Sequence, residues 1–354
     1  MWTYIVRRTL YNIPVFLSII FVVMIALRVN DPVQSQLGKN ATQRQVELLT
    51  EEMGLDQPFL VQYGIFLRDL VLIWKPIEED QAGDQVGDQV GDQGGDSKSV
   101  WKRKVTRSWD QKLPVSKMIL DAIPPSMAVT IPTLAITASI AICVGLISAF
   151  NRGRVIDKSL MFIAVTGMSI SVLVYIIIGQ YWGAYVMGDI FEGWPFQITV
   201  PAAAGATPWF FFKPTNWVAY CMLPVLINVT VALGYDTRFY RAVMVEESQR
   251  DYIRTARAKG ASVKRVMFVH MLKNAMIPII TRIMISLPFI ITGSILIEVY
   301  FGIPGMGRTL INAINAKDFP VIQTFTALFA ALFIISNILT DVLYALADPR
   351  VRLS

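Results

Sequence analysis

Few residues in this sequence have the types and spacing that a reaction centre needs. The sequence contains one histidine, His270, and two cysteines, Cys143 and Cys221. One histidine cannot form a multi-histidine metal site, and cysteines inside apolar runs are expected to pack as small side chains without forming a disulfide. The fragment nearest to a phosphate-binding loop, at residues 38–40, lacks the first glycine and the Ser/Thr of G-x-x-x-x-G-K-[ST]. We therefore expect no catalytic residues, no metal and no cofactor in this chain.

Charged residues that could bind a partner gather in residues 235–282. This stretch contains ten Lys/Arg and four Asp/Glu, and long apolar runs flank it on both sides. Loops rich in Lys/Arg beside membrane spans stay in the cytoplasm, so the charge predicts a cytoplasmic loop. Charge alone favours a solvated loop with no partner.

The middle of this loop has the pattern of a docking helix. Residues 251–259 contain no Gly or Pro and predict a short helix that Gly260 ends. A second helical run is predicted over residues 262–276. Small side chains lie among basic ones in the first helix, which would let the groove of another protein approach its backbone. The residues predicted to dock are Asp251, Tyr252, Arg254, Thr255, Ala256, Arg257, Lys259 and Gly260.

The composition is that of a helical membrane protein. Hydrophobic residues make up 54% of the chain and charged residues only 16%, against about 25% charged in soluble domains. The net charge of +6 comes from loops beside apolar runs, so it indicates membrane topology and does not indicate a nucleic-acid partner. Several uncharged runs exceed the ~20 residues that cross a bilayer as a helix. We predict an all-α polytopic protein in contact with lipid.

Six membrane spans fit the loop charges. Residues 193–212 are also apolar, but three prolines would interrupt a helix there, and a span at this place would move the basic loop to the outside. Six spans place both termini in the cytoplasm, with an N-terminal span within 1–29, a core over 122–347 that includes the loop 235–276, and a tail at 348–354. In the second span, Pro124, Pro125 and Pro132 predict an irregular start before Thr133. The predicted spans are residues 9–27, 122–151, 159–188, 214–235, 276–297 and 319–340.

Residues 30–121 form a long outer segment. Helices are predicted over 43–53 and 59–74, followed by a low-complexity insert at 75–112. The insert repeats Gly-Asp-Gln-Val, which cannot bury enough apolar surface to order itself, and its acid spacing does not match a calcium loop. A second outer segment, residues 298–320, is predicted to be a loop with a rigid turn at Gly302, Pro304, Gly305 and Gly307. At the end of the last span, Asp341 is expected to pair with a basic group.

The amino-acid sequences of several segments resemble those of one family of transport proteins. "DYIRTARAKG", followed by "HMLKNAMIPII" with Pro278 eighteen residues after Gly260, resembles the ATPase-coupling loop of ABC importer permeases of the dipeptide/oligopeptide/nickel branch. The general pattern there is Glu-Ala-Ala, three residues, Gly; Arg254 and Thr255 depart from it, while Ala256 and Gly260 fit. "GLDQPFLVQY", "FGIPGMGRTL", "DFPVIQ" and "DVLYALADPRVR" carry the same resemblance, which leaves out residues 75–112 and much of 193–214.

The resemblance implies a type I ABC importer permease in the bacterial inner membrane. It implies a second, homologous permease, two ATPase subunits that bind the ATP, and an extracytoplasmic substrate-binding protein. Peptides are the expected cargo, and nickel complexes and other small solutes are the alternatives. The alternatives are a stand-alone channel or secondary transporter, or a membrane-embedded enzyme; the scarcity of ionisable residues in the predicted spans argues against ion coupling and against an enzyme.

Overall fold

The protein is built from α-helices, as predicted. The computed structural model describes residues 2–28, 33, 42–52, 55–72, 106–197, 200–201 and 209–347. Within these residues there is no strand, and the only extended pairing is an isolated bridge between Arg107 and Pro114. The predictions for residues 75–105 of the insert and for the tail at 348–354 lie outside the described part of the chain.

The chain divides into two compact units, which are described separately. Helices α1 (Trp2–Arg28), α5 (Val115–Phe150), α18 (Met306–Asn315) and α19 (Phe319–Ala347) each contribute residues to both units. The first unit consists of Met1–Val15, Leu120–Ile311 and Phe329–Ser354, and the second of Phe16–Ile119 and Asn312–Leu328.

The helices that could cross a membrane agree with the predicted number of spans. In the described part of the chain, four helical segments are long and apolar enough, and the number becomes six if each of two bent helix pairs is one span. The four segments are Val6–Arg28, Val115–Phe150, Met276–Phe301 and Phe319–Tyr344. The bent pairs are Val155–Ser169 with Val172–Ile190, and Pro214–Tyr220 with Met222–Ser248.

The prolines of the second span do not disturb its helix, so the predicted irregular start is wrong. Helix α5 is continuous from Val115 to Phe150. Pro132 has no N–H to donate to the Ala128 carbonyl, but the indole N–H of Trp217 donates to that oxygen at 2.8 Å. A side chain distant in the sequence therefore replaces the missing donor, as neighbouring helices do for prolines in membrane helices.

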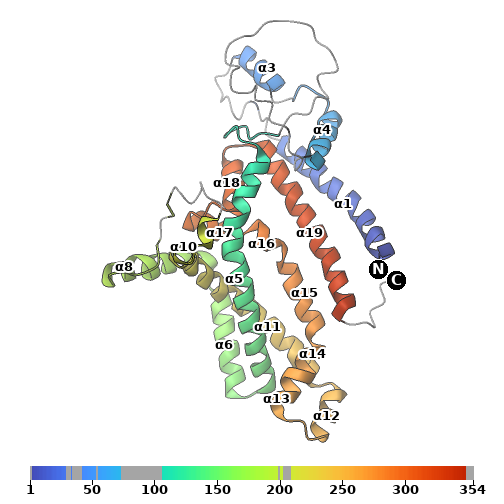
Figure 1. Cartoon of the computed structure of the whole chain (residues 1–354), viewed down its shortest axis with the longest axis vertical. Coiled ribbons are helices and arrows are strands. Elements are labelled where there is room, and N and C mark those ends of the chain that lie inside the picture. The colour runs from blue at the N-terminus through green and yellow to red at the C-terminus, as the bar shows by residue number, and fades with distance from the viewer. Residues whose placement is uncertain are drawn as a thin grey trace. The chain divides into compact units, whose positions relative to one another are not determined.

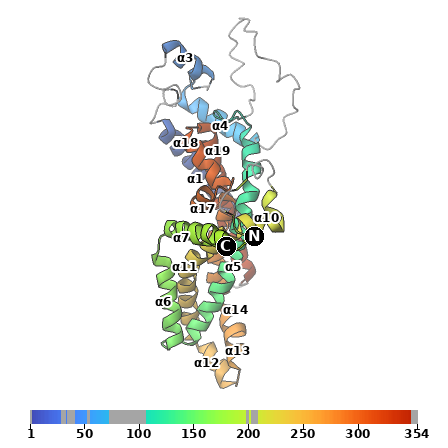
Figure 2. The same cartoon turned by 90° about the vertical axis from the view of Figure 1, so that its left-hand side faces the viewer.

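The third predicted span is bent. Helix α6 (Val155–Ser169) ends in an extended residue, Ile170, and α7 (Val172–Ile178) leaves at 87° to it. The turn is stabilised by the Tyr175 hydroxyl, which donates to the Gly167 carbonyl at 2.9 Å. The π-helix η2 (Gly179–Val186) and α8 (Met187–Ile190) continue from α7, and Figure 2 shows α7 crossing the end of α6.

The fourth span extends further than predicted. Residues 193–197, 200–201 and 209 contain no helix, and only the short 3-10 helix η3 (Phe210–Phe212) precedes α10 (Pro214–Tyr220). This agrees with the exclusion of that region as a span. Helix α11 (Met222–Ser248) then continues well past the predicted end at Tyr235, so the first part of the predicted loop is helical.

The fifth span and the segment after it are also more helical than predicted. Helices α15 (Met276–Ser286) and α16 (Pro288–Thr292) precede a break at Gly293, where φ is +71°. Helix α17 (Ile295–Phe301) follows, and then α18. The predicted outer loop at 298–320 is therefore mostly two helices joined by a turn.

The second unit contains the two helices predicted in the outer segment, α3 (Gln43–Glu52) and α4 (Phe59–Leu72). Phe21 contacts the rings of Phe59 and Tyr63 edge-on, and the Tyr63 hydroxyl donates to the Leu17 carbonyl at 2.9 Å. The segment before α5 is tied to buried Asp318, whose carboxylate accepts from the Ser108 hydroxyl and, at 3.1 Å, from the Trp109 N–H. The described residues 106–112 of the predicted insert therefore pack within this unit.

In the first unit, α5, α6 and α11 lie side by side (Figure 1) and pack closely because glycines lie at their contacts. A Cβ on Gly234 of α11 would lie 2.6 Å from the Ala164 carbonyl oxygen of α6. A Cβ on Gly145 of α5 would lie 3.0 Å from the Arg241 nitrogen of α11. Close backbone approach through small residues is how helices associate in membranes.

We expect Gly234→Ala to separate α11 from α6. The added methyl group overlaps backbone that cannot yield, so it should cost about 2 kcal/mol of folding free energy. The measurement is the thermal unfolding of the purified protein in mild detergent. Gly167→Ala is the matched control, because its Cβ would find no atom closer than 3.8 Å. Equal stability of the two variants would show that the helices separate without cost.

Candidate coupling site

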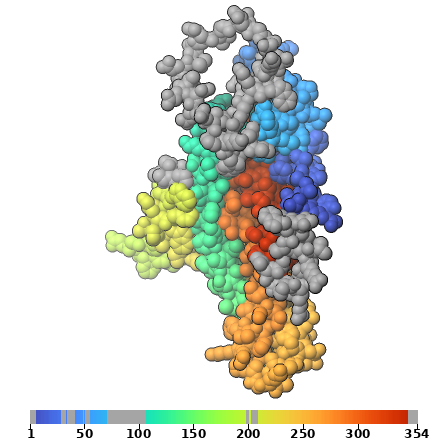
Figure 3. All heavy atoms as spheres, turned by 45° about the vertical axis from the view of Figure 1, so that its right-hand side comes forward, coloured from blue at the N-terminus to red at the C-terminus, as the bar shows by residue number. Residues whose placement is uncertain are grey.

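The predicted docking residues lie on α12 (Asp251–Ala258), directly after α11. Helix α13 (Val263–Arg265), the π-helix η4 (Val266–Met271) and α14 (Leu272–Asn274) form the second predicted helical run. Figure 1 shows α12 and α13 together at one end of the first unit, and Figure 3 shows this region, coloured light orange, at the surface. Both predicted helices are confirmed, and the middle of the second one, η4, is a π-helix.

Gly260 ends α12 in the way the sequence predicts. Its φ is +77°, which favours glycine. The Gly260 N–H donates to the Arg257 carbonyl at 2.9 Å, and the Ala261 N–H donates to the Ala256 carbonyl at 3.1 Å. This pair of bonds is the Schellman motif, so the turn after α12 is fixed by its own backbone.

Helix α12 has a packed face and an exposed face. Ile253 and Ala256 are buried, so Ala256 packs on the rest of this chain and is not available to a partner. Tyr252 is half-buried, and its hydroxyl donates to Glu247 at 2.6 Å; burial, with this bond, raises the pKa of Tyr252. The predicted residues left exposed are Asp251, Arg254, Thr255, Arg257, Lys259 and Gly260.

The packed face joins α12 to three other helical segments. Ile253 lies in a buried cluster with Leu146 of α5, Met244 of α11, and Met267 and Met271 of η4. All five side chains are at most 8% exposed. A force applied to the exposed face of α12 would therefore reach these helices through close packing.

A buried ion pair links α11 to α6 close to this cluster. Arg241 of α11 donates from Nε to Oδ1 of Asp157 at 2.6 Å and from its second terminal nitrogen to Oδ2 at 2.7 Å. Asp157, at the start of α6, also accepts from the Ser148 hydroxyl and, at 2.9 Å, from the Gly153 N–H. The sequence analysis missed this pair; the one acid in the otherwise basic link 152–158 was the available signal.

A second ion pair links α11 to α15. Arg282 donates to Oδ1 of Asp236 at 2.8 Å and lies 5.8 Å from the centre of the Phe239 ring. Arg241 and Arg282, both among the ten basic residues of 235–282, therefore hold helices of this chain together. The expected partner of Asp341 is Arg8 of α1, which confirms that prediction.

Two of the residues predicted to form the rigid outer turn, Gly305 and Gly307, lie against the buried carboxylate of Glu298. Gly302 has φ +68° and ends α17, Pro304 and Gly305 follow in the turn, and Gly307 lies in the first turn of α18. Gly305 and Gly307 are buried. The role predicted for the four residues is not tested by these positions.

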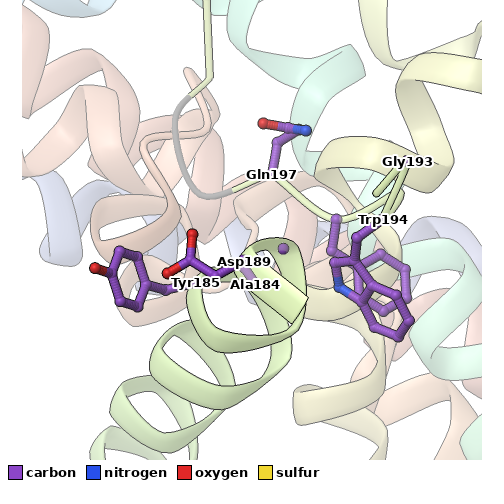
Figure 4. A pocket seen from close by; sticks show the side chains of 8 residues that line it. Ala184, Tyr185, Asp189, Gly193, Trp194 and Gln197 are labelled. Carbon is purple, nitrogen blue, oxygen red and sulfur yellow. The ribbon is translucent and has the colours of Figure 1, made fainter. Parts of the chain in front are cut away.

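A hollow of about 480 Å³ lies where α8 meets the loop after it (Figure 4). Tyr185 and Asp189 line it from the helix end, and Trp194 and Gln197 from the loop. The Trp194 indole N–H already donates to the Gly183 carbonyl at 2.7 Å. The lining offers the Asp189 carboxylate, the Gln197 amide and the Tyr185 hydroxyl.

In the described part of the chain, no group of three His, Cys, Asp or Glu side chains is placed to hold a metal ion. Cys143 is exposed and Cys221 is buried, and neither forms a disulfide.

Comparison with known proteins identifies the class. Residues 141–353 match the family described as "Binding-protein-dependent transport system inner membrane component", and residues 1–85 match the N-terminal part of such membrane components. The chain belongs to this family. It is therefore an ABC importer permease with the type I permease fold, and a multi-pass protein of the bacterial inner membrane.

Named relatives are similar over nearly their whole length. The chain is 31% identical over 353 residues to a putative peptide transport system permease protein of Brucella abortus, with 98% of each chain covered. It is 29% identical to the oligopeptide transport system permease protein of Bacillus subtilis, covering 99% of this chain and 100% of the relative. It is also 29% identical, with the same coverage, to the dipeptide transport system permease protein of Alkalihalophilus pseudofirmus.

We expect a double-mutant cycle with Asp157→Asn and Arg241→Gln to give a coupling energy of about 2 kcal/mol, because the two side chains share one buried network. Each single variant should lower the free energy of unfolding more than the double variant does, because it leaves one polar side chain without its partner. The measurement is the free energy of unfolding in detergent for the four proteins.

The control cycle uses Glu246→Gln and Arg250→Gln. Arg250 and Glu246 are also ion-paired, at 3.1 Å, but their side chains are 56% and 72% exposed. Exposed pairs of this kind couple by less than about 0.5 kcal/mol. Similar coupling energies in the two cycles would contradict a structural role for the buried pair.

Proposed function

We propose that this chain forms part of the pathway of an ATP-driven peptide importer and receives the ATP-dependent motion through α12. The observation that carries the proposal is the two-faced α12, with basic residues exposed on one side and a buried cluster on the other. The exposed residues assigned to ATPase docking are Asp251, Arg254, Thr255, Arg257, Lys259 and Gly260. Tyr252 and Ala256 position the helix from its packed side.

The partners proposed are two ATPase subunits, a second permease homologous to this one, and an extracytoplasmic substrate-binding protein. In this arrangement α12 lies in the cytoplasm, as do both termini. ATP binds to the ATPase subunits, and this chain carries no ATPase site. When the ATPase subunits close, α12 moves and rocks the helices packed on it, which alternates access to the pathway.

Peptides are the proposed cargo because the printed names of the relatives specify peptides, dipeptides and oligopeptides. The absence of a metal-binding group in the described residues gives no support to direct binding of nickel. A stand-alone channel or secondary transporter is the alternative, and it requires no ATPase.

The proposal is tested by purifying the chain in mild detergent and identifying what copurifies. An ATPase and a second permease are expected in the complex, together with ATP-dependent uptake of labelled peptides after reconstitution. Transport by the chain alone, without any ATPase, would instead establish the channel alternative.

We expect Gly260→Asp to weaken ATPase binding by at least about tenfold, the factor that corresponds to roughly 1.4 kcal/mol. The side chain would place bulk and negative charge on the basic docking face, where no atom lies within 4 Å of the new Cβ. The measurement is the amount of ATPase that copurifies with the variant.

Gly193→Asp is the matched control. Gly193 has φ +84° and the same open surroundings, but it lies in the loop after α8. It should cause the same backbone strain and leave ATPase binding intact. Equal loss of ATPase in both variants would point to damaged folding and would remove the docking role from Gly260.

A further inference from the structure

The connection between α17 and α18 closes around a buried carboxylate that the proposed function does not use. Glu298 is 1% exposed. Its Oε1 accepts from the Ser126 hydroxyl of α5 at 2.7 Å. Its Oε2 accepts from the backbone N–H groups of Gly307, at 2.8 Å, and Arg308, at 3.1 Å.

The direction of each hydrogen bond favours the ionised carboxylate. The Met306 N–H donates to the Ser126 oxygen at 2.8 Å, so the hydroxyl hydrogen of Ser126 is free to point to Glu298. Both carboxylate oxygens thus face donors. The ten-residue helix α18 begins at Met306, and a negative charge at a helix N-terminus is stabilised by the helix dipole. Glu298 therefore caps α18 while it is bound to α5.

Glycines make the space for this carboxylate. A Cβ on Gly305 would lie 2.5 Å from the Glu298 Cδ and 2.5 Å from the Ser126 oxygen. A Cβ on Gly293 would lie 1.8 Å from the Glu298 Oε1. Gly305 of the predicted outer turn thus makes room for the hydrogen bonds of Glu298 as well as reversing the chain.

The break in the fifth span is held to α5 on both sides. Before the break, the Thr130 hydroxyl of α5 shares its one hydrogen between the Ile290 carbonyl of α16, at 2.8 Å, and the Ser126 carbonyl of its own helix, at 2.7 Å. After the break, Ser126 of α5 donates to Glu298 of α17. Two contacts that bracket Gly293 leave this break little freedom to bend.

We propose that Glu298 is a positioning residue for transport, which locks α17 and the start of α18 to α5 so that they move as one element. The inference rests on the proposed ATP-driven function, in which the motion of α12 reaches α5 through the cluster of Ile253 and Leu146. A proton-relay role fits the site less well, since the backbone N–H groups on Oε2 and the Ser126 hydroxyl on Oε1 match the ionised carboxylate.

The test measures whether α17 follows α5 during the ATP cycle. Spin labels are attached at Ile131→Cys of α5 and Tyr300→Cys of α17, which are 40% and 48% exposed. The background carries Cys143→Ser, because Cys143 is exposed, whereas Cys221 is buried. The label-to-label distance is recorded by pulsed electron resonance in the purified complex with its ATPase, before and after trapping with ATP and vanadate.

In the parent, a single narrow distance distribution is expected that ATP does not change. In Glu298→Gln, the amide NH2 group is a donor, and it must face either the Ser126 hydroxyl or the backbone N–H groups of α18, which are donors too. The distance distribution should therefore broaden and become ATP-dependent. ATP hydrolysis stimulated by the binding protein should fall about tenfold, the factor for losing one hydrogen bond to a charged group, while basal hydrolysis persists. A general loss of folding would lower both activities together. Glu192→Gln, an exposed acid, is the matched control.

Ser126→Ala gives a second, smaller change if Glu298→Gln does not assemble. It removes the hydrogen bond between α5 and Glu298 and keeps those between Glu298 and α18. Ser139→Ala, on the exposed side of the same helix, is its control. Broadening in Ser126→Ala alone supports the lock. Narrow, ATP-independent distributions with normal stimulation in both variants would overturn it. If the binding protein stimulated no ATP hydrolysis in the parent complex, the proposed function itself would be overturned.

Discussion

The paired hydrogen bonds between Arg241 and Asp157 fix how α11 lies against α6, and the coupling site depends on this placement. Asp157 is 3% exposed, so a loss of its partner would leave a charge with little water around it. The pair is about three helical turns from the start of α12. Because α11 continues to Ser248 with only a short turn before α12, the direction in which α12 presents its basic face is set by a contact between two spans.

The contacts around this pair suit rigid-body motion. Gly234 brings α11 against α6 at a distance that no added methyl group would fit, and Gly145 brings α5 so close to α11 that an added methyl group would require a neighbour to shift. Interfaces packed this closely cannot deform gradually, because any local shift overlaps backbone atoms. The Asp236–Arg282 pair extends the group to α15. A displacement of α12 should therefore move these helices together.

Local features of the sequence predicted most of the fold and the position of the site. Apolar runs predicted the six spans, and Gly260 predicted the end of α12, because both depend on residues close in the chain. The errors came from distant partners. Pro132 of α5 is tolerated since Trp217 supplies a donor to Ala128, and Glu298 is buried since Ser126 and the N-terminus of α18 meet it. Sequence spacing contains no information about such contacts.

The buried charges also bear on where energy enters the protein. In the described part of the chain, the charged residues that are buried are Asp157, Glu298 and Asp318. Asp157 is neutralised by Arg241, while Glu298 and Asp318, which belong to different units, each accept from a serine hydroxyl and from backbone N–H groups. Carboxylates satisfied in this way hold structure and are poorly suited to exchange protons or ions during transport. The exposed basic face of α12, backed by a close-packed cluster, is by contrast a surface suited to receive a force from a partner.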